Sequence, residues 1–349
     1  MPMAAITVEA TIPMVRTRLL LTPSVLEKPG FTPLQRMENL EQALGCGPLY
    51  SKRDDLTPLG LGGNKTRKLE FLLGDALAGG ADTLVTVGGV QTNHGRLTAA
   101  AAAKAGLACT LVLDGARPEK LSGNLLLDCL LGASLVYTDG RSTSAVIEET
   151  LAALRAAGRA PYFIPEGGSN AVGSAGYLAM VPELLAQADS LPVPPARLVC
   201  TMGSLGTFAG LWLGARAFGA PFSVTGVAVN PTTGYTREKA AALVNEMSAA
   251  YGLDIAAAPE DMDIIYADAA HDYAGPGYNV PDAKTRGAVE LLARTEGIFL
   301  DPCYTAKSFR GFCDIARELD GGAIFVHTGG TPALWTQEHL DAFAADYWN

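Results

Sequence analysis

An alternation of short apolar runs with longer, alanine-rich segments is the sequence feature that most constrains the fold of this chain. The first half contains four short apolar runs, each followed by a segment with helical spacing. This order is typical of parallel strands that carry helices on both faces of a sheet. The predicted strands are residues 83–87, 109–113, 135–137 and 162–164, and the predicted helices are residues 91–106, 121–131, 144–158 and 173–188.

The same alternation returns after a proline-rich interruption at residues 192–195, which could mark a return from one lobe to the other. Two doubly wound open sheets with a cleft between them account for this organisation, and such sheets bind ligands at the carboxyl ends of their strands. Thr32 and Pro33 predict the start of a helix that ends near Gly45, and the first thirty residues are predicted only as an arm on the core. The remaining predictions are strands at 49–53, 198–202, 224–229, 264–267 and 323–327, and helices at 208–218, 236–251, 282–296 and 304–319.

Composition and charge narrow the class of protein. The 349 residues are 48% hydrophobic and 18% charged, which suits a globular α/β enzyme of about two domains. No apolar run reaches the roughly 18 residues of a membrane span, and the start lacks a signal-peptide pattern, so we expect a cytoplasmic protein. A formal net charge of -10 argues against a nucleic-acid partner. The six cysteines lack C-x-x-C spacing, which predicts reduced thiols and neither a disulfide framework nor a metal site.

A basic turn stands at the start of a predicted helix that begins at Asn64. Lys65, Arg67 and Lys68 follow two glycines there, although the positive end of a helix dipole disfavours cations by roughly a few tenths of a kcal/mol each. These residues alone leave two interpretations open. The turn could be solvated, or it could hold one amine where the amine loses its proton easily, as a Schiff-base lysine must.

A glycine-rich loop, GSLGTFAG at residues 203–210, directly follows a predicted strand and opens a helix. Its exposed backbone N–H groups and the helix dipole favour an anion, and Ser204 and Thr207 could add hydroxyl donors. The loop lacks both the Gly-Lys-Ser/Thr of a P-loop and the G-x-G-x-x-G spacing. It therefore indicates a phosphate site of another kind, unless the glycines only permit a tight turn.

Two further loops leave predicted strands in the same sense, at residues 88–96 and 327–330. Asn93 could form a hydrogen bond with an aromatic hydroxyl or a carboxylate, and Thr92 could donate a hydroxyl. Taken singly, such residues near a helix start are more often N-caps, and a histidine such as His94 is more often a satisfied surface or cleft residue than a catalytic base. All these loops could converge on one cleft.

Seven segments between residues 32 and 334 together resemble one enzyme family. They are similar to the pyridoxal-phosphate enzymes of the D-cysteine desulfhydrase and 1-aminocyclopropane-1-carboxylate (ACC) deaminase group. The resemblance implies the tryptophan synthase β-like fold, with a large cofactor-binding domain of residues 1–66 and 170–349 and a small domain of residues 67–169. It also implies a homodimer that acts on a small amino acid. The segments are GGNKTRKLEFL, GGVQTNHGR, IPEGGSNAVGSAGY, GSLGTFAG, GPGYNVP, ARTEGIFLDPCYTAKS and HTGGTPAL.

The resemblance also assigns roles to individual residues. It implies that Lys65 binds pyridoxal 5'-phosphate covalently, that Asn93 contacts the cofactor's 3-hydroxyl and that Thr328 faces its pyridine nitrogen. The phosphate would be held by the loop Gly203, Ser204, Leu205, Gly206 and Thr207. Catalytic roles are implied for Lys65, Thr92, Tyr278 and Tyr304, and substrate contacts for Thr92, Asn93, His94, Tyr278 and Tyr304.

The chain departs from the family pattern at positions that bear on the reaction. Thr92 stands where the family has serine, which narrows the pocket or reorients the hydroxyl. Thr305 and Thr328 stand where the deaminases carry glutamate and leucine, and both changes favour β-elimination over opening of a cyclopropane ring. We therefore predict a lyase that eliminates a β-substituent from a small amino acid, D-cysteine first, giving pyruvate, ammonia and sulfide.

The alternatives differ in substrate or in class. An L-cysteate sulfo-lyase would need an extra cation for the sulfonate, which Arg96 or Arg310 could supply. An ACC deaminase and an enzyme that eliminates the substituent of another β-substituted alanine are the other alternative reactions within the family. A family member that binds the cofactor without turnover is a third. From another class, the loop at 203–210 alone would suit a non-catalytic protein that binds a phosphate ligand.

Overall fold

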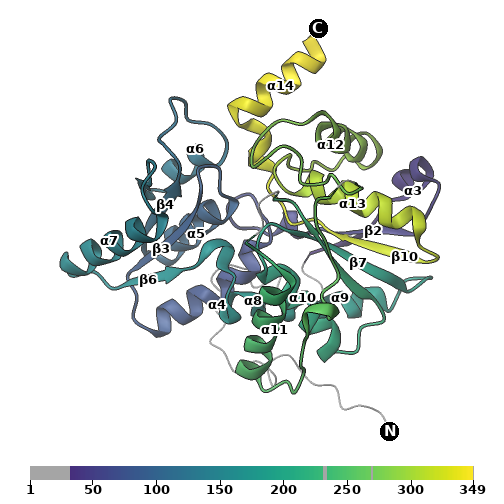
Figure 1. Cartoon of the computed structure of the whole chain (residues 1–349), viewed down its shortest axis with the longest axis horizontal. Helices are drawn as coiled ribbons and strands as arrows, with labels where there is room; N and C mark the ends of the chain where they lie inside the picture. The colour runs from purple at the N-terminus through teal and green to yellow at the C-terminus, as the bar shows by residue number, and fades with distance from the viewer. Residues whose placement is uncertain (1–31, 231–233, 269, 349) are drawn as a thin grey trace.

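The computed structural model describes residues 32–230, 234–268 and 270–348, which form two sheets side by side (Figure 1). The larger sheet has the strand order β1-β2-β10-β7-β8-β9, in which only β1 is antiparallel to its neighbour. The smaller sheet has the order β5-β4-β3-β6 and is parallel throughout. The strands are β1 (Leu34–Arg36), β2 (Leu49–Lys52), β3 (Thr83–Gly89), β4 (Ala108–Asp114), β5 (Ser134–Tyr137), β6 (Pro161–Ile164), β7 (Pro195–Met202), β8 (Ser223–Ala228), β9 (Ile264–Ile265) and β10 (Gly322–Val326).

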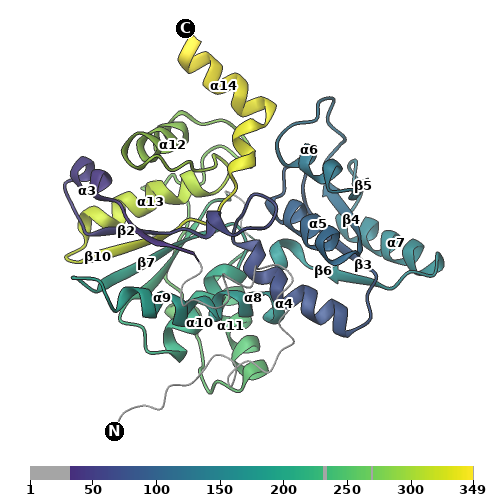
Figure 2. The same cartoon turned by 180° about the vertical axis from the view of Figure 1, so that it is seen from behind.

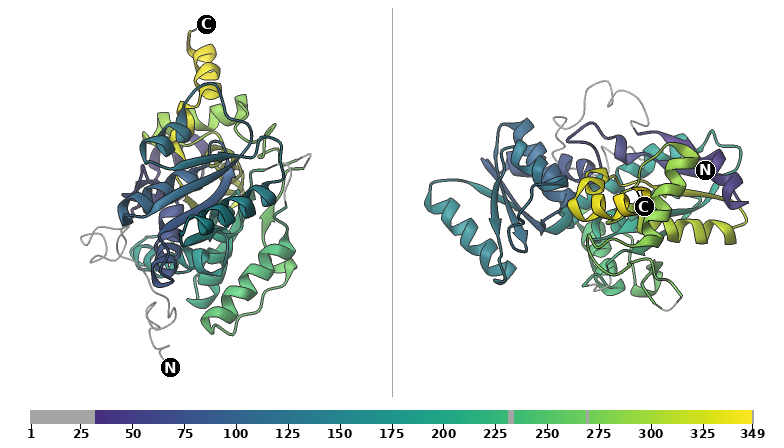
Figure 3. Two further views of the ribbon diagram at one scale, coloured as in Figure 1. Left: turned by 90° about the vertical axis from the view of Figure 1, so that its left-hand side faces the viewer. Right: turned by 90° about the horizontal axis from the view of Figure 1, so that it is seen from above.

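Helices cover both faces of each sheet, and the views from behind and from above show the two layered bodies next to each other (Figures 2 and 3). The C-terminal helix α14 projects away from the larger body (Figure 1). The helices are α3 (Glu38–Leu44), α4 (Lys65–Ala78), α5 (Asn93–Ala105), α6 (Gly123–Leu130), α7 (Thr143–Ala156), α8 (Ala171–Leu178), α9 (Met180–Ala188), α10 (Gly206–Ala217), α11 (Arg237–Tyr251), α12 (Ala283–Glu296), α13 (Thr305–Glu318) and α14 (Gln337–Trp348), with short 3-10 turns η1 (Asp54–Leu56), η2 (Glu166–Gly168), η3 (Pro259–Asp261) and η4 (Thr331–Trp335).

Alternate residues of the central strands pack into two separate hydrophobic cores in the larger body. In β10, Ile324 and Val326 pack into the core formed with α8 to α11, whereas Ala323 and Phe325 pack into the core formed with α3, α12 and α13. Side chains of a strand alternate between its faces, so a strand that is apolar throughout must be covered on both sides. This burial explains why the predicted strands read as continuous apolar runs.

The structure confirms the predicted fold class of two doubly wound open sheets and corrects several elements. The helix predicted from Thr32 begins only at Glu38, because residues 34–36 form the edge strand β1. The predicted helix at 173–188 is divided into α8 and α9 at Ala179. Pro182 has no N–H for the carbonyl four residues earlier, which explains the break. The predicted N-terminal arm lies outside the described residues, and the domain boundaries at residues 66 and 170 stay predictions.

Candidate active site

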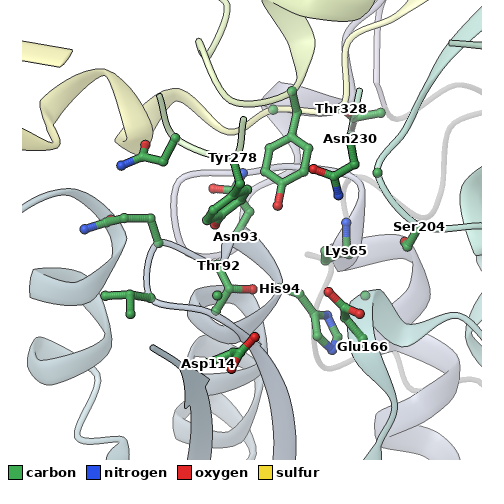
Figure 4. A pocket seen from close by; sticks show the side chains of 18 of the residues that line it. Lys65, Thr92, Asn93, His94, Asp114, Glu166, Ser204, Asn230, Tyr278 and Thr328 are labelled. Atoms are coloured by element: carbon green, nitrogen blue, oxygen red, sulfur yellow. The ribbon is translucent and has the colours of Figure 1, made fainter. Parts of the chain in front are cut away.

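A cavity of about 730 Å³ lies between the two sheets, at the carboxyl ends of their strands. Its walls come from segments that follow β3, β4 and β6 of the smaller sheet and β7, β8 and β10 of the larger one. Parallel strands end at one edge of a sheet, so loops that are distant in the sequence meet there. The wall includes most of the predicted site residues: Lys65, Thr92, Asn93, His94, Gly203, Ser204, Thr207, Tyr278, Tyr304 and Thr328 (Figure 4).

Lys65 is the first residue of α4 and extends its amine into the cavity (Figure 4). Its Nζ donates a hydrogen bond to Asn64 Oδ1 at 3.1 Å, and Asn64 Nδ2 donates to Thr207 Oγ1 at 3.0 Å. Burial and, to a smaller extent, the nearby Arg96 guanidinium lower the pKa of the Lys65 amine to about 8, while Glu166 opposes the shift. About a tenth of this amine is therefore neutral at pH 7, far more than for an ordinary lysine, and the neutral form is the one that a nucleophile or a proton acceptor requires.

The loop that leads into Lys65 is held by the segment after β10. The Asn64 N–H donates to Thr328 O at 3.0 Å, and a Cβ on Gly63 would lie 3.1 Å from the same carbonyl oxygen. Gly63 also has a φ of 129°, which side-chain-bearing residues rarely adopt. The two loops therefore approach closely only because glycine stands here, and this contact brings Lys65 and Thr328 to one cavity.

Arg67 and Lys68 are both buried, so a solvated basic turn is wrong for these two residues. Arg67 forms ion pairs with Asp54 at 2.8 Å and with Glu183 at 3.0 Å. Lys68 lies on another face of α4, where its Nζ donates to Gly167 O at 2.9 Å. Burial lowers the pKa of Lys68 well below its ordinary value, and the Lys65 ammonium adds to this shift.

The glycine-rich loop after β7 forms a cradle at the N-terminus of α10. A Cβ on Gly203 would lie 2.8 Å from the Tyr304 ring, and one on Gly206 would lie 2.7 Å from Lys68 Nζ. The Gly206 N–H donates to Ser169 Oγ at 3.1 Å, and that hydroxyl donates to Ser204 Oγ at 3.0 Å. A helix N-terminus, hydroxyl groups and a buried amine together suit a phosphate group. Gly203, Ser204 and Thr207 line the cavity, whereas Leu205 and Gly206 do not.

The loop after β3 brings three predicted residues to the opposite wall. Thr92 caps α5, since its Oγ1 accepts a hydrogen bond from the Gly95 N–H at 3.2 Å. Asn93 Oδ1 accepts from Asn124 Nδ2 at 2.9 Å. His94 is buried, and neither ring nitrogen has a hydrogen-bond partner among the described residues. Burial lowers the pKa of His94 well below its ordinary value, with Lys65 and Lys68 contributing, so the imidazole is neutral.

Two tyrosines stand edge to face in the wall of the cavity. The ring centroids of Tyr278 and Tyr304 are 5.9 Å apart, with an interplanar angle of 66°. Burial raises the pKa of both phenols above their ordinary value. Both hydroxyls therefore stay protonated and could donate to a ligand.

Besides Leu205 and Gly206, three further residues singled out in the sequence do not reach the cavity. The Thr305 hydroxyl donates to Asp301 Oδ1 at 2.7 Å and is buried beneath the wall. Arg96 is directed toward the loop before Lys65, where its NH2 group donates to Gly62 O at 3.2 Å. Arg310 lies 3.8 Å from Asp282. Neither arginine lines the cavity, so the cation suggested for a sulfonate substrate is absent at these two positions.

The sequence analysis missed several polar residues of the wall. Glu166 accepts a hydrogen bond from the Tyr235 hydroxyl at 2.6 Å, and Asn230 follows the end of β8. Both could have been found from the rule that ligands bind at the carboxyl ends of parallel strands. Glu338 belongs to α14, for which no prediction was made. The other missed polar residues include Asn64, Gln91, Asp114, Glu119, Lys120, Ser122, Asn279 and Gln337.

The described residues contain no group of three or more His, Cys, Asp or Glu side chains that could hold a metal ion. Within residues 32–230, 234–268 and 270–348, no helix has both the length and the apolar character needed to span a bilayer. The six cysteines are free thiols.

Comparisons with known proteins place this geometry in a family. Residues 25–329 match the family model described as pyridoxal-phosphate dependent enzyme. The D-cysteine desulfhydrase of Yersinia enterocolitica is 40% identical over 314 residues, which cover 87% of this chain and 92% of that protein. The D-cysteine desulfhydrase of Klebsiella pneumoniae is 41% identical over 314 residues, with 87% and 93% covered.

Solved structures agree with the family match. The crystal structure of an ACC deaminase homologue superposes with a TM-score of 0.85 at 33% identity, over 98% of this chain and 99% of that chain. Threonine deaminase isoform 2 from Solanum lycopersicum has a TM-score of 0.64 at 17% identity, over 95% of this chain and 86% of that chain, and this likeness concerns the fold alone. The chain belongs to the family of pyridoxal-phosphate dependent enzymes.

Proposed function

We propose that this protein eliminates the β-substituent of a small amino acid, with D-cysteine as the preferred substrate and pyruvate, ammonia and sulfide as products. The observation that carries the proposal is that a lysine with a pKa of about 8 and a glycine-lined phosphate cradle open on one cavity. The relatives named D-cysteine desulfhydrase support the choice of substrate. Membership of an enzyme family argues against a non-catalytic phosphate-binding protein.

The residues of the cavity fit pyridoxal 5'-phosphate. Lys65 Nζ would hold the cofactor covalently, Asn93 would donate to its 3-oxygen and Thr328 would face its pyridine nitrogen. The cradle at the N-terminus of α10 suits the phosphate, with Ser204 and Thr207 on the cavity wall and the Lys68 amine next to Gly206. When bound, the cofactor supplies an electron sink for the charge that develops as the substrate loses its α-proton.

Four side chains of this protein would then handle protons and charge. In its neutral form Lys65 Nζ can accept the α-proton, because burial keeps its pKa near neutral. Tyr278 and Tyr304 keep their hydroxyl protons and can donate to the departing β-substituent. The Thr328 hydroxyl, unlike a carboxylate, does not enforce a proton on the ring nitrogen. A milder electron sink of this kind favours expulsion of a leaving group over racemisation or transamination.

The charge of the cavity wall bears on the alternative substrates. Lys65 and Lys120 are its lysines, and Lys65 would lose its free amine to the cofactor. A second anionic group on the substrate, such as the sulfonate of L-cysteate, would therefore meet more negative than positive charge. The wall favours a thiol over a sulfonate as the β-substituent. The acidic residues of the wall are Asp114, Glu119, Glu166 and Glu338.

A substrate panel tests the proposal. Cofactor-loaded protein should release keto acid from D-cysteine with a kcat/KM at least roughly tenfold above that for L-cysteine, L-cysteate or ACC. β-Chloro-D-alanine should also react, because chloride is a good leaving group. A higher kcat/KM for ACC or L-cysteate than for D-cysteine would contradict the proposed substrate and favour one of the two family alternatives.

We further propose that the large domain of the protein comprises residues 1–66 and 170–349, with residues 67–169 as the small domain.

We also propose that the protein is a cytoplasmic homodimer. Exposed apolar side chains near the projecting α14 support a dimer interface there: Trp335, Leu340, Tyr347 and Trp348. Light scattering should give twice the chain mass of 36.3 kDa. A mass of one chain at micromolar concentration would contradict the dimer.

A further inference from the structure

The orientation of the Asn93 amide is set by a residue outside the cavity. Asn124, the second residue of α6, donates from its Nδ2 to Asn93 Oδ1 at 2.9 Å. Because that oxygen is engaged, the Nδ2 group of Asn93 is the part of the amide left for other contacts. It lies 3.0 Å from the position that a Cβ on Gly330 would take, next to the segment after β10. Asn93 therefore offers the cavity a donor, not an acceptor.

The hydrogen-bond acceptors around Asn124 fix the orientation of its own side-chain amide. Its Nδ2 has two hydrogens, and the second is donated to Gln91 O at 2.9 Å. Turning this amide over would place an oxygen against two acceptors, Gln91 O and Asn93 Oδ1, and would remove both hydrogen bonds. Asn124 has an exposed fraction of 0%, so water cannot replace what would be lost. Only one orientation of each amide is therefore compatible with the site.

The start of α6 is built to hold Asn124 in place. Gln91 Oε1 accepts from the Asn124 N–H at 2.9 Å, and Gln91 Nε2 donates to Ser122 O at 3.1 Å. Gly123, between them, has a φ of 55°, and a Cβ there would lie 2.6 Å from Gln91 Oε1 and 2.8 Å from a methyl of Thr336. Glycine at this position lets α6, the loop after β3 and the turn η4 of the larger body meet.

We propose that Asn124 is a positioning residue that forces Asn93 to present its N–H to the cofactor's 3-oxygen. The inference rests on the proposed contact between Asn93 and the cofactor, and it adds a reason for the direction of that hydrogen bond. An N–H donor stabilises the ionised form of the 3-oxygen, which an amide oxygen would repel. Through Asn124, the start of α6 controls the charge at the cofactor ring without lining the cavity.

Two substitutions of Asn124 test this role in the cofactor-bound protein, without substrate. Asn124→Asp keeps the shape but turns a carboxylate toward Gln91 O and Asn93 Oδ1, so Asn93 must rotate its amide or lose its partner. Asn124→Ala removes the donor without adding charge. Both variants should bind the cofactor roughly tenfold or more weakly, and the pH midpoint of the cofactor's visible absorbance should rise by about one unit, because the ionised 3-oxygen loses a hydrogen-bond donor.

The matched control is Asn245→Asp on α11, where an amide also donates to a backbone carbonyl, that of Ala257 at 2.9 Å, but far from the cavity. It should leave cofactor affinity and the pH midpoint unchanged. The proposal is overturned if both Asn124 variants keep the wild-type affinity and midpoint. It is also overturned if affinity falls while the midpoint stays, because Asn124 would then support only packing. Neither readout involves an amino-acid substrate, so a wrong choice of D-cysteine would not affect the result.

Discussion

Two groups of buried charge flank α4, and they differ in how their charge is balanced. The ion-pair cluster, formed by Lys52, Asp54, Arg67 and Glu183, joins each cation to a carboxylate. The pocket cluster, formed by Lys65, Lys68 and His94, has no carboxylate within ion-pair distance among the residues that the structure describes. In the ion-pair cluster Asp54 and Glu183 raise the pKa of Arg67, whereas burial lowers the pKa of Lys52 against the opposing effect of Glu183. In the pocket cluster burial lowers the pKa of all three groups.

The difference distinguishes charged residues of α4 that stabilise the fold from charged residues of the same helix that serve the binding of a ligand. A buried pair that is complete in the protein needs no ligand, whereas buried bases that lack an acid are costly until an anion arrives. A cofactor phosphate dianion beside Lys68 would supply the missing negative charge. The pocket cluster should therefore respond to the cofactor, and the ion-pair cluster should respond only to unfolding.

The largest effect is expected from removing the Lys65 amine. Lys65→Ala should lose the visible absorbance of the bound cofactor and at least roughly 10³-fold in turnover, since both the covalent attachment and the proton acceptor are lost. Absorbance spectra and keto-acid release measure the two losses. Lys104→Met, at an exposed position of α5, serves as the control, because it keeps Lys65 and should keep the visible band. A Lys65→Ala protein that retained band and turnover would refute the assignment of this lysine.

Removing Arg67 should destabilise the fold, with little effect on the chemistry of the folded protein. Arg67→Met leaves Asp54 and Glu183 with an uncompensated buried charge, which costs about 3–5 kcal/mol of unfolding free energy. Denaturant unfolding measures this loss. The control is Arg141→Met, which breaks the exposed pair with Glu149 and should cost less than about 1 kcal/mol. Equal costs at the two sites would show that the ion-pair cluster is not structural.

Removing the Lys68 charge should weaken cofactor binding without destabilising the cofactor-free protein. Lys68→Met deletes an ammonium next to Gly206 in the phosphate cradle, a charge-assisted contact of about 1.5–3 kcal/mol, so the cofactor should dissociate roughly 10- to 100-fold more readily. Titration of the cofactor-free protein followed by absorbance gives this constant. If the affinity for the cofactor were unchanged and the unfolding free energy fell strongly, Lys68 would stabilise the fold, as the ion-pair cluster does, and would not bind the phosphate.

The sequence predicted the strands and the loops better than the interactions of the charged side chains. Apolar runs followed by glycine loops are local signals, and parallel strands bring such loops to one edge, which is why Ser204 and Thr328 could be predicted at the site. The ion pairs of Arg67 could not be predicted, because its partners Asp54 and Glu183 lie 13 and 116 residues away. The role of Asn124 in orienting Asn93 depends on a separation of 31 residues and on amide geometry, which no spacing pattern encodes.

The smallest expected effect is a pH dependence of stability in the cofactor-free protein. The pKa of Lys65 falls from 10.5 to about 8 on folding, so between these values the unfolded chain binds more protons than the folded one. The unfolding free energy should then rise with pH across this window, and the destabilisation by Lys65 is fully present below pH 8.

At pH 7 the unfolding free energy of Lys65→Met should therefore exceed that of the wild type by about 1–2 kcal/mol, a value that allows for screening by water in the cavity. This difference should shrink as the pH approaches 10.5. Denaturant unfolding of both cofactor-free proteins at several pH values measures the difference. Lys104→Met, at an exposed position of α5, should follow the wild type throughout. A constant difference between Lys65→Met and the wild type from pH 7 to pH 10 would mean that Lys65 is not held in a desolvated pocket, and the contrast between the two clusters would fail at its central residue.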